Sequence, residues 1–326
     1  MPFTRKLGYL VLVFMLPMGI CPAGCAPKEV GAGSRAVERE GTIIVSGAFA
    51  LYPMMIRWGE EFQALHPGVI FDVSAGGAGK GMADALSGAV DIGMVSRPVF
   101  NVEIEKGAFW VPVAKDAVVV TVNAENPVLD QLLARGLTRD AVRDIWITEE
   151  AATWGQMVGS ETTEAIHVYT RADACGAAQT WAEYLGNYSQ EDLKGVAVQA
   201  DPGVAEAVNQ DALAIGYNNL NFAYSADTGE PVEGIQVVPL DLDENGQIDP
   251  GESFYKTKGD LMGAIAEERY PSPPSRALNL VTQGKPEGLV RTFIRWVMTD
   301  GQQYLDEVGY IHLSQEQLDE GLMKLE

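Results

Sequence analysis

The stretch from residue 71 to residue 99 constrains the fold most, because it holds a strand, a glycine turn, a helix and a second strand in few residues. The turn, Gly-Gly-Ala-Gly at positions 76–79, favours positive φ angles that other residues rarely adopt. The apolar residues of the next segment share one helical face, and they are Met82, Ala85, Leu86 and Ala89. A helix that begins at such a turn presents free N–H groups and the positive end of its dipole. The stretch therefore indicates an anion site or, alternatively, only a tight connection.

Two further segments repeat this strand–turn–helix plan. The first is residues 41–66, in which a β-branched strand precedes an amphipathic helix. The second is residues 165–185, whose turn contains Arg171. Strands that alternate with helices predict an α/β fold.

The order of these segments predicts two lobes with two hinge crossings. A dense apolar run before residue 123 predicts paired buried strands, and the Pro-rich segment 270–274 predicts a crossing back. We therefore expect lobe 1 to comprise residues 41–123 and 275–326, and lobe 2 residues 124–274. Each lobe should be a mixed sheet flanked by helices.

The N-terminal residues predict export. Residues 1–24 have a charged start and an apolar run too short to cross a membrane, as in a signal peptide. Residues 22–25, Pro-Ala-Gly-Cys, resemble the lipobox of bacterial lipoproteins, which implies cleavage before Cys25 and lipidation of that cysteine. An ordinary secretory signal is the alternative. Residues 25–40 predict a flexible tether, so the lipid would anchor the protein to the cell membrane, facing the periplasm or the exterior.

Charge and cysteine content limit the partners. The formal net charge of −22 disfavours nucleic acid and anionic lipid, so a bound anion must be held by local dipoles and one or two arginines. The chain has three cysteines. Cys21 falls in the signal peptide and Cys25 would take the lipid, which leaves Cys175 without a disulfide partner.

Several motifs together resemble one known family, the phosphate-binding lipoproteins of the Pst ABC transporter, which are type II solute-binding proteins. The motifs are residues 47–53 with Trp58, 76–81, 90–93, 96–98, 170–173, 301–302 and 309–310. The resemblance implies a two-lobed fold and no enzymatic activity. It also implies a monomer that captures an oxoanion, most often phosphate, and delivers it to the permease subunits of an ABC importer.

The resemblance also implies which residues bind the ligand. In the family, oxoanion ligands come from four turns, and matching them to this sequence gives Ala50, Leu51, Gly77, Ala78, Ser96, Arg97, Arg171, Cys175, Gly176 and Ala177. Asp173 would pair with Arg171 and fix the orientation of its guanidinium group.

The chain departs from the family pattern at four of these positions. Leu51, Ala78, Cys175 and Ala177 stand where the family usually has a hydroxyl residue. Backbone donors survive such changes, but hydroxyl donors are lost. Ser96 and Arg97 would be the replacement donors. Another oxoanion, or a larger phosphorylated compound that uses the space freed by Ala78 and Ala177, therefore remains an alternative ligand.

Residues 241–252 match the twelve-residue calcium loop of EF-hand proteins. Acids or amides occupy positions 1, 3, 5 and 9, Gly246 occupies position 6 and Glu252 position 12. The flanks are not helical, because residues 235–240 predict a strand. We predict a structural Ca²⁺ bound by Asp241, Asp243, Asn245, the carbonyl of Gln247, Asp249 and Glu252. A solvated acidic turn is the alternative.

Other functional classes have weaker support. The sequence has three histidines and lacks the G-x-S-x-G and H-E-x-x-H motifs of common hydrolases. Cys175 precedes a predicted helix, where the pKa of a thiol can fall, so a reactive thiol is one alternative. A calcium-dependent surface protein with a vestigial pocket is another.

Overall fold

The computed structural model describes residues 40–326. The predicted signal peptide, the predicted lipidation site Cys25 and nearly all of the predicted tether therefore lie outside the described residues. In the described part, nine strands form one sheet in the order β2 (Val69–Ala75), β1 (Gly41–Gly47), β3 (Ile92–Val95), β9 (Ser275–Gln283), β4 (Ala108–Asn123), β7 (Ala214–Asn219), β5 (His167–Arg171) and β6 (Val196–Val198). The ninth strand, β8 (Ile235–Val238), also pairs with β4. Among the helices of the described part, none combines the length and the apolar character needed to cross a membrane.

The first hydrophobic core is built on three parallel strands, β1 (Gly41–Gly47), β2 (Val69–Ala75) and β3 (Ile92–Val95). The long helix α1 (Tyr52–Leu65) buries Met54, Met55, Trp58 and Phe62, as the apolar period predicts. The other helical segments of this lobe are η1 (Phe49–Leu51), α2 (Ala78–Ser87), α3 (Asn101–Glu105), α11 (Gly288–Val297), η4 (Asp300–Tyr304), α12 (Leu305–Val308) and α13 (Gln315–Leu325).

The strands of the second lobe are β5 (His167–Arg171), β6 (Val196–Val198), β7 (Ala214–Asn219) and β8 (Ile235–Val238). Trp146, Trp154 and Trp181 are fully buried there, so these tryptophans are core residues. The helical segments of this lobe are α4 (Leu129–Arg135), α5 (Arg139–Arg143), η2 (Asp144–Thr148), α6 (Trp154–Val158), α7 (Gly176–Gly186), η3 (Gln190–Asp192), α8 (Ala200–Gln210), α9 (Leu220–Ala223) and α10 (Lys258–Ala266).

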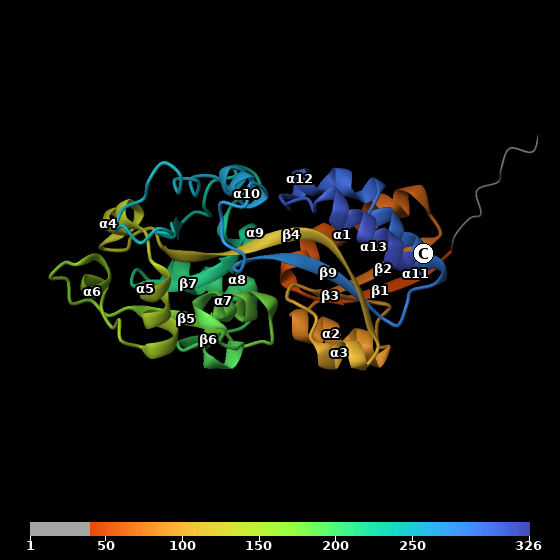
Figure 1. The fold of residues 1–326 in the computed structure, drawn as a ribbon, viewed down its shortest axis with the longest axis horizontal. Coiled ribbons are helices and arrows are strands. Elements are labelled where there is room, and N and C mark those ends of the chain that lie inside the picture. The colour runs from red at the N-terminus through yellow and green to blue at the C-terminus, as the bar shows by residue number, and fades with distance from the viewer. Residues whose placement is uncertain (1–39) are drawn as a thin grey trace, which may run out of the picture. The chain divides into compact units, whose positions relative to one another are not determined.

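Two antiparallel strands connect the lobes (Figure 1). The sixteen-residue strand β4 (Ala108–Asn123) pairs with β9 (Ser275–Gln283) as far as Ala117, and then with β7 from Val118 to Val122. Pro112 lies at an irregularity in the β4–β9 register, which suits a residue that lacks an N–H group. Because β4 takes part in both lobes without a break, it is itself one of the two crossings.

Along β4, the residues leave the first hydrophobic core and enter the second before the lobe boundary that was expected at residue 123. Ala114 packs in the first core, whereas Ala117 already packs in the second. The change in composition after residue 122 marks the end of the strand rather than the crossing. On the return path, Tyr270 belongs to the second core and Leu278 to the first. Ile311 packs in the second core although its neighbours belong to the first, because it bridges to Lys115 on β4.

Candidate functional site

The predicted glycine turn lies beside the turn that follows β1. The carbonyl of Gly47 accepts hydrogen bonds from the N–H groups of Gly76 and Gly77, at 2.9 and 3.0 Å. Gly77 has φ +91°, which explains the need for glycine. The carboxyl ends of β1, β2 and β3 meet here, and such an edge is where α/β sheets bind ligands.

The glycine turn of lobe 1 touches the arginine turn of lobe 2. The N–H group of Gly79 donates to the carbonyl of Ala174 at 2.9 Å. A Cβ atom on Gly77 would come within 2.7 Å of the same carbonyl, and one on Gly176 would overlap the carbonyl and hydroxyl of Ser96. The two lobes are thus in contact at these turns, and only glycine allows such close approach.

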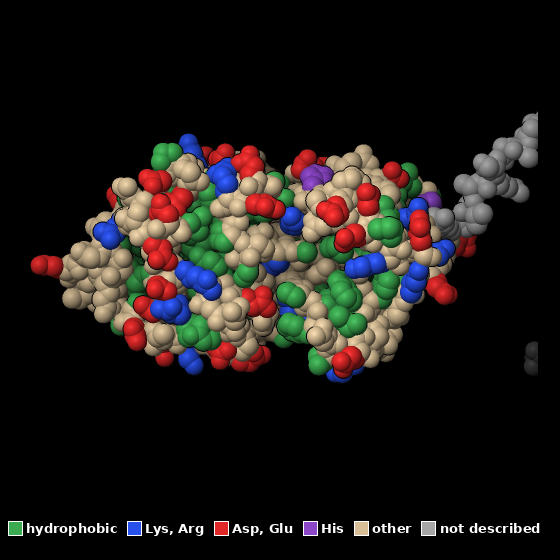
Figure 2. Space-filling view, in the orientation of Figure 1, with side chains coloured by type: hydrophobic (Ala, Val, Ile, Leu, Met, Phe, Trp, Pro, Cys, Tyr) green, Lys and Arg blue, Asp and Glu red, His purple; other side chains and the backbone are tan. Residues whose placement is uncertain are grey.

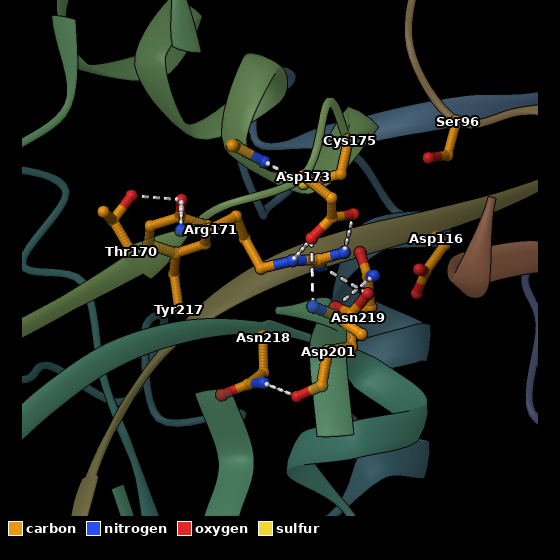
Figure 3. A network of polar contacts seen from close by, with 12 residues as sticks. Ser96, Asp116, Thr170, Arg171, Asp173, Cys175, Asp201, Tyr217, Asn218 and Asn219 are labelled. Atoms are coloured by element: carbon orange, nitrogen blue, oxygen red, sulfur yellow. Dashed lines mark hydrogen bonds and ion pairs between the residues drawn. The ribbon is translucent and has the colours of Figure 1, made fainter. Parts of the chain in front are cut away.

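Arg171 lies in this contact region with its side chain 1% exposed. Its Nε and Nη2 donate to the two carboxylate oxygens of Asp173, at 2.9 and 2.6 Å, and its Nη1 donates to Asp201 at 2.5 Å (Figure 3). The ring of Phe49 lies 5.7 Å below the guanidinium carbon. Arginine has five N–H donors, so these three bonds leave one donor on each terminal nitrogen for a ligand.

Electrostatics keep this arginine charged. Burial by itself would lower the pKa of Arg171, but Asp201 and then the other nearby groups outweigh it, and the pKa rises. Burial would raise the pKa of Asp173, but the hydrogen bonds from Arg171 outweigh that effect and the pKa falls. Asp173 also accepts a hydrogen bond from the N–H group of Ala200, so its orientation is fixed from two sides. The predicted pairing of Asp173 with Arg171 is therefore present in the structure.

Arg97, the other arginine predicted at the site, is paired with Glu103 and not with the cluster around Arg171. The Nη1 and Nη2 of Arg97 donate to the carboxylate of Glu103 on α3, at 3.0 and 2.7 Å, and the guanidinium lies over the ring of Phe100. Burial would raise the pKa of Glu103, but the bonds from Arg97 and the Phe100 N–H group lower it. This ion pair uses a donor on each terminal nitrogen of Arg97, the residue that was expected to bind the anion.

The remaining predicted residues of lobe 1 are buried at the site. Ala50, Leu51 and Ala78 are at most 2% exposed, and Ser96 is 2% exposed. The N–H group of Leu51 donates to the carbonyl of Ala48. The carbonyl of Ala50 accepts from the hydroxyl of Tyr310, which ties this turn to the C-terminal segment.

Cys175 is the N-cap of α7. Its Sγ accepts a hydrogen bond from the N–H group of Ala178 at 3.3 Å, in the role that a serine or threonine oxygen usually fills. Burial raises the pKa of the thiol to about 12, and the residue is 5% exposed. Both the burial and the raised pKa of this thiol disfavour the reactive-thiol alternative. Gly176 and Ala177 follow in the first turn of the helix, where N–H groups lack intrahelical partners.

Three further charged residues belong to this cluster and were not predicted from the sequence. Asp201, at the start of α8, is 1% exposed and joins Arg171 to the side-chain amide of Asn219. Arg276, on β9, is 6% exposed and lies 3.6 Å from Asp116 on β4. Burial raises the pKa of Asp116, although the charge of Arg276 opposes the shift. For Asp116 and Arg276, a charged residue inside an apolar strand was the available signal, because buried charges are nearly always paired.

The predicted calcium loop brings its carboxylates together. Oxygen atoms of Asp241, Asp243 and Glu252 lie within 4.8 Å of one another, and Asp241 and Glu252 are 2% and 7% exposed. Gly246 has φ +82°, as the sharp turn requires. The N–H group of Ile248 donates to the carbonyl of Ala134 and so attaches the loop to α4.

The other predicted metal ligands surround these three. The side-chain amide of Asn245 donates to Asp243 and Asp249, at 3.1 and 2.8 Å, and the N–H group of Gln247 donates to Asn245. This set of carboxylate and amide oxygens suits a hard cation such as Ca²⁺.

Comparison with known proteins identifies the family to which this chain belongs. The profile of the PBP superfamily domain matches residues 33–301, and the chain belongs to this family. A phosphate-binding protein PstS from Methanocaldococcus jannaschii is 26% identical over 92% of this chain and 90% of its own length. The PstS protein of Bacillus subtilis is 26% identical over 70% of this chain and 74% of its own length.

A solved structure is similar over most of the described chain. It is a putative phosphate ABC transporter substrate-binding protein with bound phosphate from Clostridium perfringens, with a TM-score of 0.67 and 21% identity. The alignment covers 84% of this chain and all of that one. The two-lobed α/β fold predicted from the sequence is therefore confirmed.

Proposed function

We propose that this protein captures an inorganic oxoanion, phosphate first among candidates, between its two lobes. The observation that carries the proposal is Arg171, a buried guanidinium held by Asp173 and Asp201 with one donor left on each terminal nitrogen. It lies where the glycine turn of lobe 1 meets the arginine turn of lobe 2. The names of the relatives, phosphate-binding proteins, support the same ligand.

Local groups rather than a basic surface would hold this anion. Acidic side chains are spread over the visible face of the molecule, with basic ones scattered among them (Figure 2). The formal charge of −22 repels anions at long range, so binding must depend on short-range hydrogen bonds in a closed cleft.

In the proposed mechanism the protein binds and releases its ligand without covalent chemistry. The anion stabilises the closed state because only that state lets both lobes contact it. The closed form then delivers the anion to the permease of an ABC importer. We further propose that the protein works as a monomer outside the cytoplasm, tethered through a lipid on Cys25. One similar structure is of a protein described as periplasmic, which supports this location.

Isothermal titration of the purified protein with phosphate, sulfate, molybdate and small phosphate esters tests the proposal. We expect phosphate to bind with one site per chain and sulfate to bind more weakly. Binding of an ester without binding of phosphate would favour the alternative ligand suggested by Leu51, Ala78, Cys175 and Ala177. If none of these anions gave a heat of binding, the proposed oxoanion function would be contradicted.

We also propose that residues 241–252 bind one structural Ca²⁺. The twelve-residue pattern and the grouping of Asp241, Asp243 and Glu252 support it, with Asn245, Asp249 and the carbonyl of Gln247 as further ligands. The ion would stabilise lobe 2 by neutralising carboxylates that otherwise repel one another. An affinity on the order of 10⁻⁴–10⁻³ M suffices outside the cell.

Thermal unfolding with EDTA and with millimolar Ca²⁺ checks the calcium proposal. At about 10 mM, which is 100 times a Kd of about 10⁻⁴ M, Ca²⁺ adds about 2.7 kcal/mol to the free energy of unfolding, and this corresponds to a rise in Tm of roughly 5–10 °C. Glu252→Gln should abolish the rise. Glu244→Gln makes the same charge change at an exposed, non-ligating position of the loop and should keep it. A wild-type Tm that does not respond to Ca²⁺ would mean that the loop is a solvated acidic turn.

A further inference from the structure

Arg276 carries a buried donor that no described contact uses. Its Nε donates to the carbonyl of Ser96 at 3.0 Å, and its Nη2 donates to the side-chain oxygen of Asn219. Its Nη1 is buried and has no hydrogen-bond partner among the described residues. A buried donor on a charged group is costly to leave unsatisfied, so such an atom indicates a missing partner.

The surroundings of Arg276 are those of the anion site. The Ser96 carbonyl that it contacts lies against Gly176, at the start of the eleven-residue helix α7. On its other side, Asn219 donates to Asp201, which in turn holds Arg171. Figure 3 shows Asn219 and Asp201 beside the Arg171–Asp173 pair, with Ser96 and Asp116 to one side. Arg276 is therefore two side chains away from the predicted ligand arginine.

The contacts of Arg276 come from both lobes. Ser96 follows β3 in lobe 1, whereas Asn219 ends β7 in lobe 2, and Arg276 itself lies on the crossing strand β9. The guanidinium can make both bonds only while the lobes are together. Its unused Nη1 is thus held in place in the closed state.

With Arg171 alone, the acidic groups of the cluster would outnumber the basic ones by two, and Arg276 reduces this excess to one. Three carboxylates, those of Asp116, Asp173 and Asp201, lie around the guanidinium groups of Arg171 and Arg276. Arg171 is already paired with two of these acids, so by itself it leaves little net positive charge for an anion. Arg276 is bonded to neutral groups through Nε and Nη2, and its pairing with Asp116 is longer, at 3.6 Å.

We propose that Arg276 is a second ligand-binding arginine, whose Nη1 donates to the oxoanion once the lobes have closed. The inference rests on the proposed function and adds a residue to that site. Arg171 and Arg276 would then have different roles. Arg171 binds within lobe 2, whereas Arg276 adds its donor and its charge only in the closed complex, so it favours closure around the more highly charged form of the anion.

Titration calorimetry with inorganic phosphate tests this role in wild type, Arg276→Gln and Arg276→Lys. Measurements at about pH 6 and about pH 8 fall on either side of the range in which phosphate takes its second charge. We expect Arg276→Gln to bind about 10- to 100-fold more weakly, with the larger loss at the higher pH. Arg276→Lys should bind with intermediate affinity and keep the wild-type pH profile. Arg143→Gln, a matched loss of an arginine on the surface of lobe 2, should bind as wild type does.

The outcomes separate this inference from the proposed function. A wild type that binds no oxoanion of the panel would overturn both. A wild type that binds phosphate, with Arg276→Gln binding equally well, would overturn the role of Arg276 alone. An equal loss at both pH values in the Gln variant would also overturn it, because such a loss reflects lobe packing rather than charge on the ligand. If the Gln variant does not fold, the Lys variant decides: intermediate affinity with the wild-type pH profile supports the role of Arg276, and wild-type affinity or a changed pH profile overturns it.

Discussion

Replacing Arg171 by lysine is expected to weaken phosphate binding by at least about 100-fold, which corresponds to about 3 kcal/mol. Lysine keeps the positive charge that Asp173 and Asp201 require. It cannot satisfy both acids and still offer two directed donors to an anion, because its ammonium has three donors on one atom. The loss should therefore appear in binding while the fold persists. Titration calorimetry together with far-UV circular dichroism measures both.

To remove the charge of Arg171 entirely, one of its acidic partners must be neutralised in the same variant. Arg171→Ala would leave Asp173 and Asp201 buried without a cation, which costs about 3–5 kcal/mol and confounds binding with unfolding. Arg171→Gln combined with Asp201→Asn removes one charge of each sign and avoids most of this cost. We expect no measurable phosphate binding by the double variant. Arg57→Lys, in an ion pair on α1, is the control that should bind normally. Normal binding by Arg171→Lys would mean that the arginine is structural.

Gly176→Val is expected to weaken phosphate binding by more than about 100-fold, because it should prevent the lobes from closing. A Cβ there overlaps the carbonyl and hydroxyl of Ser96 in the opposite lobe. The backbone of Gly176 is helical and unstrained, so the open protein should tolerate the change. A population that cannot close loses the contacts made by the second lobe, and the apparent affinity falls with the closed fraction.

Small-angle scattering with and without phosphate measures closure directly. Wild type should contract on adding phosphate and Gly176→Val should not. Gly263→Ala is the matched control, since a Cβ on this helical glycine meets open space. If Gly176→Val contracted and bound phosphate as wild type does, the contact between Gly176 and Ser96 would not belong to the ligand-bound state.

The parts of the site that the sequence predicts are those determined by neighbouring residues. The glycine turn and the Arg171–Asp173 pair each depend on residues within a few positions of one another, and both form in the structure. Arg97 could also have been assigned differently by this logic, because its partner Glu103 is only six positions away. A nearby opposite charge thus determines the position of this side chain in the structure.

The missed residues depend on pairings between distant segments. Asp201 reaches Arg171 across 30 positions, and Arg276 reaches Ser96 across 180. No local period or motif reports such a contact, since it arises only when β9 crosses between the lobes. The position of the crossing was missed for a similar reason. Residues 117–122 continue the apolar pattern of β4 without a break, although they pack in a different core.

The path of the chain also sets the order in which the two cores can form. Lobe 2 is almost continuous in sequence, whereas the first core needs β9, Phe293 on α11 and Leu325 on α13 to complete it. During synthesis, the strands nearest the N-terminus are therefore made first but acquire their full packing last. They remain without β9 and these helices until the chain is nearly finished. Contacts across so many residues slow folding, so lobe 2 can complete its core while the first core still waits for the C-terminal segments.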